Sequence, residues 1–310
     1  MLSFNSSFGQ NLVPNPGFEE YFGCPNGSNQ LDRCKSWKRI GGGTPDFFNA
    51  CAVNPWEPDV PNTWNGYQNS HSGDGMAGFY ASQRQYGDNV REYLQIRLTQ
   101  PLDSGVNYYV HFYVSPQDSS YYSVGTIGAY ISDTITHPTY DAGRLVVNPQ
   151  IVYSSSYSIT DTMNWTLVSG TFMPHSNNLD YITIGNFFPD SSSRISNLLH
   201  QSGGNSYYFI DDVCVSTDLI NCLSFVGLND LDNDIDIQLF PNPFQENVTI
   251  TTNRNGPVCI YLYDITARLL IQRGFSNSTI LNTDQLSSGM YIYEVRSEGV
   301  VMQKGKLMKQ

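Results

Sequence analysis

Two stretches of this sequence place aromatic side chains among hydrogen-bonding side chains, a combination that suits a sugar ligand. An aromatic face packs against the C–H surface of a sugar ring, while amide, carboxylate and guanidinium groups bond its hydroxyls. Residues 50–69 and 83–92 supply the candidate ligand-binding residues, which are Trp56, Trp64, Tyr67, Arg84 and Tyr86. The same residue types also form protein-binding surfaces, and the two tryptophans could instead close the ends of a β-sandwich as packing residues.

Residues that could act as catalysts are present, but their spacing matches no catalytic motif. The five histidines are scattered, no H-E-x-x-H occurs, and G-x-S-x-G is absent. His71, Ser72 and Asp74 resemble a catalytic triad only by residue type, because neighbours in a strand or turn point apart. Nothing singles out a carboxylate pair for glycoside hydrolysis. We therefore expect a protein that is not an enzyme.

The charge of the chain argues against several classes of partner. Charged residues make up 14% of the 310 residues, and the formal net charge is −12. Nucleic acids and anionic membrane surfaces are bound largely through Lys and Arg, so we expect neither as a partner. No window approaches 18 consecutive apolar residues, so we expect no membrane-spanning segment.

Alternating apolar residues predict the elements that must position these side chains. Along residues 107–115, Tyr108, Val110, Phe112 and Val114 share one face, and residues 91–98 show the same period of two. Turn signals rich in Gly, Pro and Asn separate such runs at the spacing of a sandwich. The sequence therefore predicts an all-β fold with an antiparallel β-sandwich in its N-terminal part.

The six cysteines fit an exported protein. Cys214 and Cys222 bracket a loop short enough to close locally, so we predict a disulfide between them. Cys24, Cys34 and Cys51 form an odd cluster that leaves one thiol over, and we favour the pair Cys24–Cys51. Residues 1–9 are interpreted as the remnant of a signal peptide, with Ser7 and Gly9 at its cleavage site.

The composition changes after Cys222. The acidic residues 229–236 indicate an exposed linker, and the strands that follow Phe240 predict a second, small Ig-like β-sandwich. We therefore divide the chain into a signal-peptide remnant (1–9), a jelly-roll domain (10–222), an acidic linker (223–239) and a C-terminal domain (240–310).

The C-terminal domain resembles the type A sorting domain of the Bacteroidota type IX secretion system. The resemblance rests on the opening Phe-Pro-Asn-Pro, a central Gly-Met-Tyr and a closing basic strand, represented by Phe240, Pro241, Asn242, Pro243, Gly289, Tyr291, Lys304 and Lys306. It implies Sec export followed by type IX secretion, with the secretion translocon as a partner. The protein would then be secreted or held at the outer cell surface.

The N-terminal domain resembles the galactose-binding-like jelly rolls found among carbohydrate-binding modules. The matching stretches are Asn15–Glu19, His71–Gly78 and Tyr208–Val213. The resemblance implies a β-sandwich whose first and last strands lie side by side, often joined by a structural calcium ion. It also implies a non-catalytic binding protein, with a glycan as the expected ligand and a protein partner, as for an adhesin, as the alternative.

A calcium site in this domain would use carboxylates from both ends of the chain. The candidates are Glu19 or Glu20 with Asp211 or Asp212, and Asp74 as a further ligand. Consecutive strand residues face opposite ways, so we expect only one residue of each pair to reach a shared site. The alternative is that Asp211 and Asp212 hydrogen-bond the loop before them.

Overall fold

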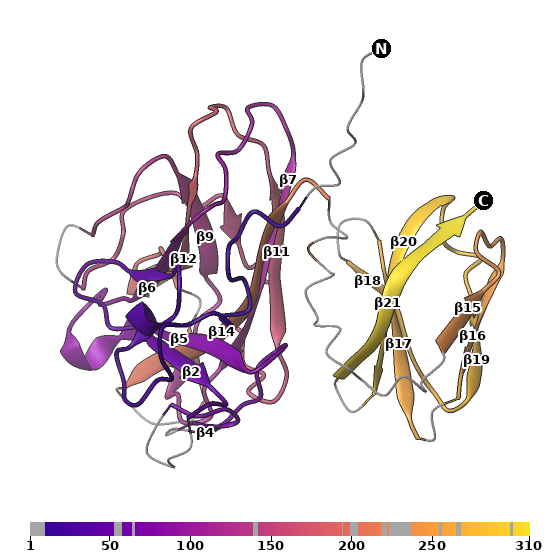
Figure 1. The fold of residues 1–310 in the computed structure, drawn as a ribbon, viewed down its shortest axis with the longest axis horizontal. Helices are drawn as coiled ribbons and strands as arrows, with labels where there is room; N and C mark the ends of the chain where they lie inside the picture. Colours follow the sequence, from indigo (N-terminus) through magenta and orange to yellow (C-terminus); the bar gives the residue numbers. More distant parts are fainter. Residues whose placement is uncertain are drawn as a thin grey trace. The chain divides into compact units, whose positions relative to one another are not determined.

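The computed structural model divides the chain into two compact units, Met1–Phe225 and Val226–Gln310 (Figure 1). Each unit has a hydrophobic core of its own. The residues that the structure describes are 10–52, 58–63, 66–138, 142–193, 195–198, 204–218, 222, 237–253, 256–264, 268–297 and 300–310. The proposed signal-peptide remnant, Trp56 and Trp64 lie outside the described residues.

The first unit is a sandwich of two antiparallel five-stranded sheets. One sheet has the order β1-β6-β12-β9-β10, with β1 Lys38–Arg39, β6 Tyr93–Arg97, β12 Tyr181–Asn186, β9 Ile127–Ser132 and β10 Ile151–Val152. The other has the order β11-β7-β14-β5-β2, with β11 Thr166–Phe172, β7 Tyr108–Pro116, β14 Asn205–Ser216, β5 Gly75–Gln83 and β2 Asp46–Asn49. Short elements complete the unit: β3 Asn62–Thr63 with β4 Gly66–Tyr67, β8 Tyr122–Ser123 with β13 Ser196–Asn197, and the 3₁₀ turns η1 Leu31–Arg33, η2 Arg84–Tyr86 and η3 Asp190–Ser192.

The core lies between these two sheets, as the alternation predicts. Tyr108, Val110, Phe112 and Val114 of β7 are all buried in it. The opposite face of β7 is covered as well, because the His71 ring stacks on Tyr113 with ring centroids 3.7 Å apart. The predicted all-β fold and the sandwich are therefore confirmed.

The second unit is a smaller sandwich of three-stranded and four-stranded antiparallel sheets. The first has the order β15-β16-β19, with β15 Ile237–Phe240, β16 Asn247–Thr252 and β19 Ser278–Asn282. The second has the order β18-β17-β20-β21, with β18 Leu269–Phe275, β17 Val258–Tyr263, β20 Gly289–Ser297 and β21 Val300–Lys309.

The second unit includes residues that the sequence pattern assigns to the linker. Ile237 pairs with Thr252 and Leu239 with Ile250, so β15 begins before Phe240. The alternating burial of Ile237 and Leu239 against this core explains why they form a strand. The rest of the expected linker lies outside the described residues.

Both predicted disulfides are present. Cys24 is bonded to Cys51, and Cys214 is bonded to Cys222. The first bond joins two segments that precede and follow β2, and the second anchors the end of β14. Cys34 is the thiol left over from the N-terminal cluster, and it is buried. The burial raises the pKa of this thiol well above its usual range.

Candidate functional site

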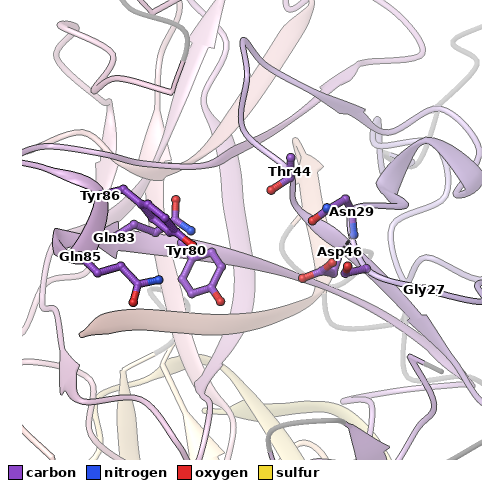
Figure 2. Close-up of a pocket in the computed structure, with 9 residues that line it drawn as sticks. Gly27, Asn29, Thr44, Asp46, Tyr80, Gln83, Gln85 and Tyr86 are labelled. Atoms are coloured by element: carbon purple, nitrogen blue, oxygen red, sulfur yellow. Dashed lines mark hydrogen bonds between the residues drawn. The ribbon is translucent and has the colours of Figure 1, made fainter. Parts of the chain in front are cut away.

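A cavity of about 700 Å³ opens between the chain before β2 and the end of β5. Figure 2 shows its side chains in two facing groups, with Gly27, Asn29, Thr44 and Asp46 on one side and Tyr80, Gln83, Gln85 and Tyr86 on the other. Ser28 completes the lining. The pairing of β2 with β5, in which Asp46 lies opposite Gly78, brings these distant segments together.

Asp46 is a buried carboxylate in the wall of this cavity. Its side chain accepts a hydrogen bond of 2.6 Å from the Tyr207 hydroxyl and one of 2.6 Å from the Asn29 backbone N–H. Burial raises the pKa of Asp46 to about 6, although both hydrogen bonds lower it.

Glu92 is a second buried carboxylate, and it holds both walls of the cavity from behind. One oxygen accepts bonds from the Thr44 backbone N–H (2.8 Å) and hydroxyl (2.9 Å), and the other accepts one from the Tyr80 N–H (2.9 Å). Burial raises the pKa of Glu92 to about 7. Because Thr44 and Tyr80 lie on opposite sides of the cavity, Glu92 fixes the width between them.

Two tyrosines give the cavity its aromatic surface. The Tyr80 ring packs edge-on against Tyr207, with centroids 4.8 Å apart, so its position is fixed. Tyr86 lies at the end of η2 and is 71% exposed, which leaves its ring free to contact a ligand. Gln83 and Gln85 flank it with amide groups that both donate and accept hydrogen bonds.

Of the predicted ligand-binding residues, Tyr67, Arg84 and Tyr86 belong to the part of the chain that the structure describes, and one of them lines this cavity. Tyr86 lines the cavity, whereas Arg84 points its guanidinium toward Asp190 (3.8 Å) and over the Tyr122 ring (5.2 Å). Tyr67 lies on the β3–β4 hairpin, where its N–H donates to Asp118, and it is not among the lining residues. Sequence reasoning missed Asp46, although a charged residue in the fully buried strand β2 is a recognisable signal.

The predicted metal ligands come from three parts of the first unit. Glu19 lies in the chain before β1, Asp74 lies in the loop before β5, and Asp211 and Asp212 lie in β14. Asp211 accepts bonds from the backbone N–H groups of His71 (2.8 Å) and Ser72 (3.1 Å). Asp212 bonds the His71 ring at Nδ1 (2.5 Å) and accepts a bond from the Ser72 hydroxyl (2.6 Å). Glu19 accepts bonds from the N–H groups of Asp74 (3.0 Å) and Gly75 (2.9 Å).

The expectation that only one of Asp211 and Asp212 reaches this site is wrong. Strand β14 is irregular between Asp211 and Cys214 in its pairing with β7, and Asp212 has a φ of 49°. Such a bulge interrupts the alternation of side chains, so both carboxylates point at the same loop. Burial and the neighbouring Asp212 charge raise the pKa of Asp211 well above its usual range.

This arrangement does not fit a calcium shell. The carboxylate oxygens of Asp211 and Asp212 already accept bonds from the loop or the strand itself, and the Asp74 side chain is exposed. Calcium requires six to eight oxygen ligands. Among the described residues, no group of three His, Cys, Asp or Glu side chains is placed to hold a metal ion. The hydrogen-bonded loop corresponds to the alternative considered from the sequence.

Calcium binding by this cluster stays a prediction of the resemblance, and thermal unfolding tests it. The hydrogen-bonded arrangement leads us to expect the same unfolding midpoint in calcium and in chelator, because the carboxylates already hold the loop. A higher midpoint in calcium, with one bound ion found by elemental analysis, would show that Glu19, Asp211 and Asp212 reorganise around the ion. Magnesium at the same concentration controls for ionic strength.

The triad-like trio of the sequence is not assembled as a catalytic site. The Ser72 hydroxyl donates to the Asp212 carboxylate, and the His71 ring bonds the same carboxylate. A serine nucleophile instead requires its hydroxyl to donate to the imidazole that acts as its base. Asp74 contributes its backbone N–H to Glu19. These contacts are those of a structural loop.

The residues of the predicted sorting signal gather where the second unit's first loop meets its last strand. The Asn242 amide donates to the Lys306 carbonyl (2.9 Å), and its oxygen accepts from the Met308 N–H (2.9 Å). On β20 and β21, Gly289 pairs with Lys309, Tyr291 with Leu307 and Glu294 with Lys304. Phe240, Pro241 and Pro243 belong to β15 and the turn that follows it.

The family comparison decides the role of this unit. Residues 238–310 match the family model of the secretion system C-terminal sorting domain. This sorting domain is that of type IX secretion, so the protein is secreted or carried to the cell surface. Among the described residues, no helix is long and apolar enough to cross a membrane. A search of curated proteins finds no match to the chain.

Solved structures similar to this chain include binding modules. The CBM22-1 xylan-binding domain of Paenibacillus barcinonensis Xyn10C has 12% identity and a TM-score of 0.35, covering 67% of this chain and 94% of that one. The K1 cleaved adhesin domain of Lys-gingipain from Porphyromonas gingivalis has 15% identity and a TM-score of 0.32, covering 64% and 94%. Because these identities and TM-scores are low, we assign the fold class from the strand order of this chain and not from the similar structures.

Proposed function

We propose that the first unit binds a glycan in the cavity between β2 and the end of β5, and that the sorting domain delivers this unit outside the cell. The observation that carries the proposal is the lining itself. It joins two tyrosine rings to amide, hydroxyl and backbone groups that can bond sugar hydroxyls. Its volume of about 700 Å³ lies in the usual range for small-ligand sites.

The walls of the cavity are held in place by hydrogen bonds within the protein. Glu92 ties Thr44 to Tyr80, and Asp46 ties Asn29 to Tyr207. A site whose groups are already fixed loses less conformational entropy on binding, which favours affinity. This support fits recognition of a ligand better than a surface that must first become ordered.

The same geometry favours binding over hydrolysis. Canonical glycosidases place two carboxyl groups on either side of the scissile bond. Asp46 lines the cavity. Glu92 is 1% exposed, and its two oxygens accept hydrogen bonds from Thr44 and Tyr80. Only one carboxyl among the described lining residues is therefore available to a ligand in this cavity, and we propose a non-catalytic binding protein.

Replacement of Tyr86 by alanine tests the proposed site. On a glycan array and then by calorimetry, the full-length chain should bind a glycan, and Tyr86→Ala should weaken that binding by about tenfold or more, equivalent to ~1.4 kcal/mol. The exposed ring supports no core contact, so the fold should be unchanged. Tyr157→Ala is the matched control, because Tyr157 is 79% exposed and lies outside the lining.

Two outcomes would contradict this assignment. Equal losses for Tyr86→Ala and Tyr157→Ala would remove the cavity as the site, and a loss on Trp64→Ala or Trp56→Ala would return the site to the loops first considered. A silent array, together with capture of a defined surface protein by the full-length chain, would favour the alternative of an adhesin-like protein.

A further inference from the structure

We infer that the cavity selects neutral glycans against acidic ones, and that Asp46 is the residue that sets this selectivity. The inference rests on the proposed glycan-binding function and specifies its ligand class. Asp46 is the one charged side chain among the described lining residues; the others are tyrosines, amides, hydroxyls and a glycine.

Two arginines close to the lining residues in the sequence are directed toward Asp190. Arg84 belongs to η2, between Gln83 and Gln85 of the lining, yet its guanidinium lies 3.8 Å from Asp190 and 5.2 Å from the centre of the Tyr122 ring. Arg91 is buried and also bonds Asp190. Asp190 thus partly balances both guanidinium groups, and neither arginine belongs to the lining, so Asp46 is the charged side chain of the lining that a ligand carboxylate would meet.

Burial of Asp46 makes its charge effective at the cavity wall. The residue is 5% exposed, so water screens its carboxylate poorly. Placing a second carboxylate beside it costs free energy through repulsion and lost hydration. A sugar hydroxyl, by contrast, can donate to Asp46, because each carboxylate oxygen has a second lone pair beyond its bond to Asn29 or Tyr207.

The groups that face Asp46 give this selectivity a dependence on pH. Tyr207 from β14 and Tyr80 from β5 stay neutral, because burial raises the pKa of both hydroxyls, that of Tyr80 to about 12. Glu92, which precedes β6, adds a negative charge above a pKa of about 7. Asp46 itself is neutral well below a pKa of about 6 and negative well above it. Discrimination against acidic glycans should therefore strengthen as the pH rises from 5 to 8.

The test compares two ligands that differ at one carbon. The probes are the neutral oligosaccharide bound most tightly on the array and its uronate counterpart, with a carboxylate in place of one CH₂OH group. At pH 8 the full-length chain should bind the neutral probe about tenfold more tightly or better, and the ratio should shrink at pH 5. Asp46→Asn should remove the change in this ratio between pH 5 and 6, a range that lies below the pKa of Glu92.

A positive charge added to the cavity lining tests the selectivity independently if Asp46→Asn fails to fold. Gln85→Lys should recover uronate binding at pH 8, whereas Gln100→Lys, at an exposed glutamine outside the lining, should not. Equal binding of both probes by the wild-type chain at pH 8 would overturn the selectivity while the proposed function stands. Binding of neither probe, nor of any arrayed glycan, would overturn both.

Discussion

A chain that lacks Ile237–Gln310 is expected to be found in the periplasm and not in the medium or on the cell surface. This deletion removes every described strand of the sorting domain, which is the part of the chain that matches the secretion family. The first unit keeps its own core and both disulfides, so it should still fold. Fractionation of a Bacteroidota host with an active type IX system measures the effect.

Two companion chains sharpen this prediction. Removal of the residues from Lys304 onward should reduce secretion nearly as much. It removes most of β21, the buried Leu307 and the Lys306 carbonyl to which the Asn242 amide donates. Residues 237–310 fused to a periplasmic reporter should carry that reporter out of the cell. Truncated protein recovered outside the cell, or a reporter that stays behind, would contradict the assignment.

Gly78→Ala is expected to destabilise the first unit by roughly 3 kcal/mol or more. A Cβ at this position of β5 would overlap the Tyr207 hydroxyl. Tyr207 is buried and bonded to Asp46, so it cannot move aside without leaving a buried carboxylate short of a partner. The same substitution should therefore also distort the cavity wall.

Chemical unfolding followed by a probe of the first unit measures this cost. Gly23→Ala is the matched control in the same unit, because its Cβ would approach nothing closer than the Arg33 guanidinium at 3.9 Å. The control should stay within about 0.5 kcal/mol of the wild type. A similar stability for both variants would mean that Tyr207 is not packed over Gly78 as described.

The sequence alone predicts those features that depend on local patterns. Alternation along β7 predicts which side chains enter the core, and the short spacing between Cys214 and Cys222 predicts their bond. The Phe-Pro-Asn-Pro motif and the closing basic strand are enough to indicate the sorting domain. Each of these signals lies within one segment or its immediate neighbours.

The cavity could not be predicted in the same way, because it depends on pairing between distant segments. Residues 27–29, 44–46 and 80–86 meet only once β2 lies beside β5 in the register that places Asp46 opposite Gly78. The sequence also does not predict that Asp211 and Asp212 point toward the same loop. A bulge in β14 overrides the alternation that consecutive strand residues normally follow.

The most direct test of the account is to map where the glycan binds. Nuclear magnetic resonance of the labelled full-length chain, titrated with the oligosaccharide selected on the array, reports this residue by residue. We predict that the amide signals of Gly27–Asn29, Asp46 and Gln83–Tyr86 shift, and that those of the β3–β4 hairpin around Tyr67 do not. Shifts confined to the hairpin, with none around Asp46 and Tyr86, would contradict the assignment of this cavity as the glycan site.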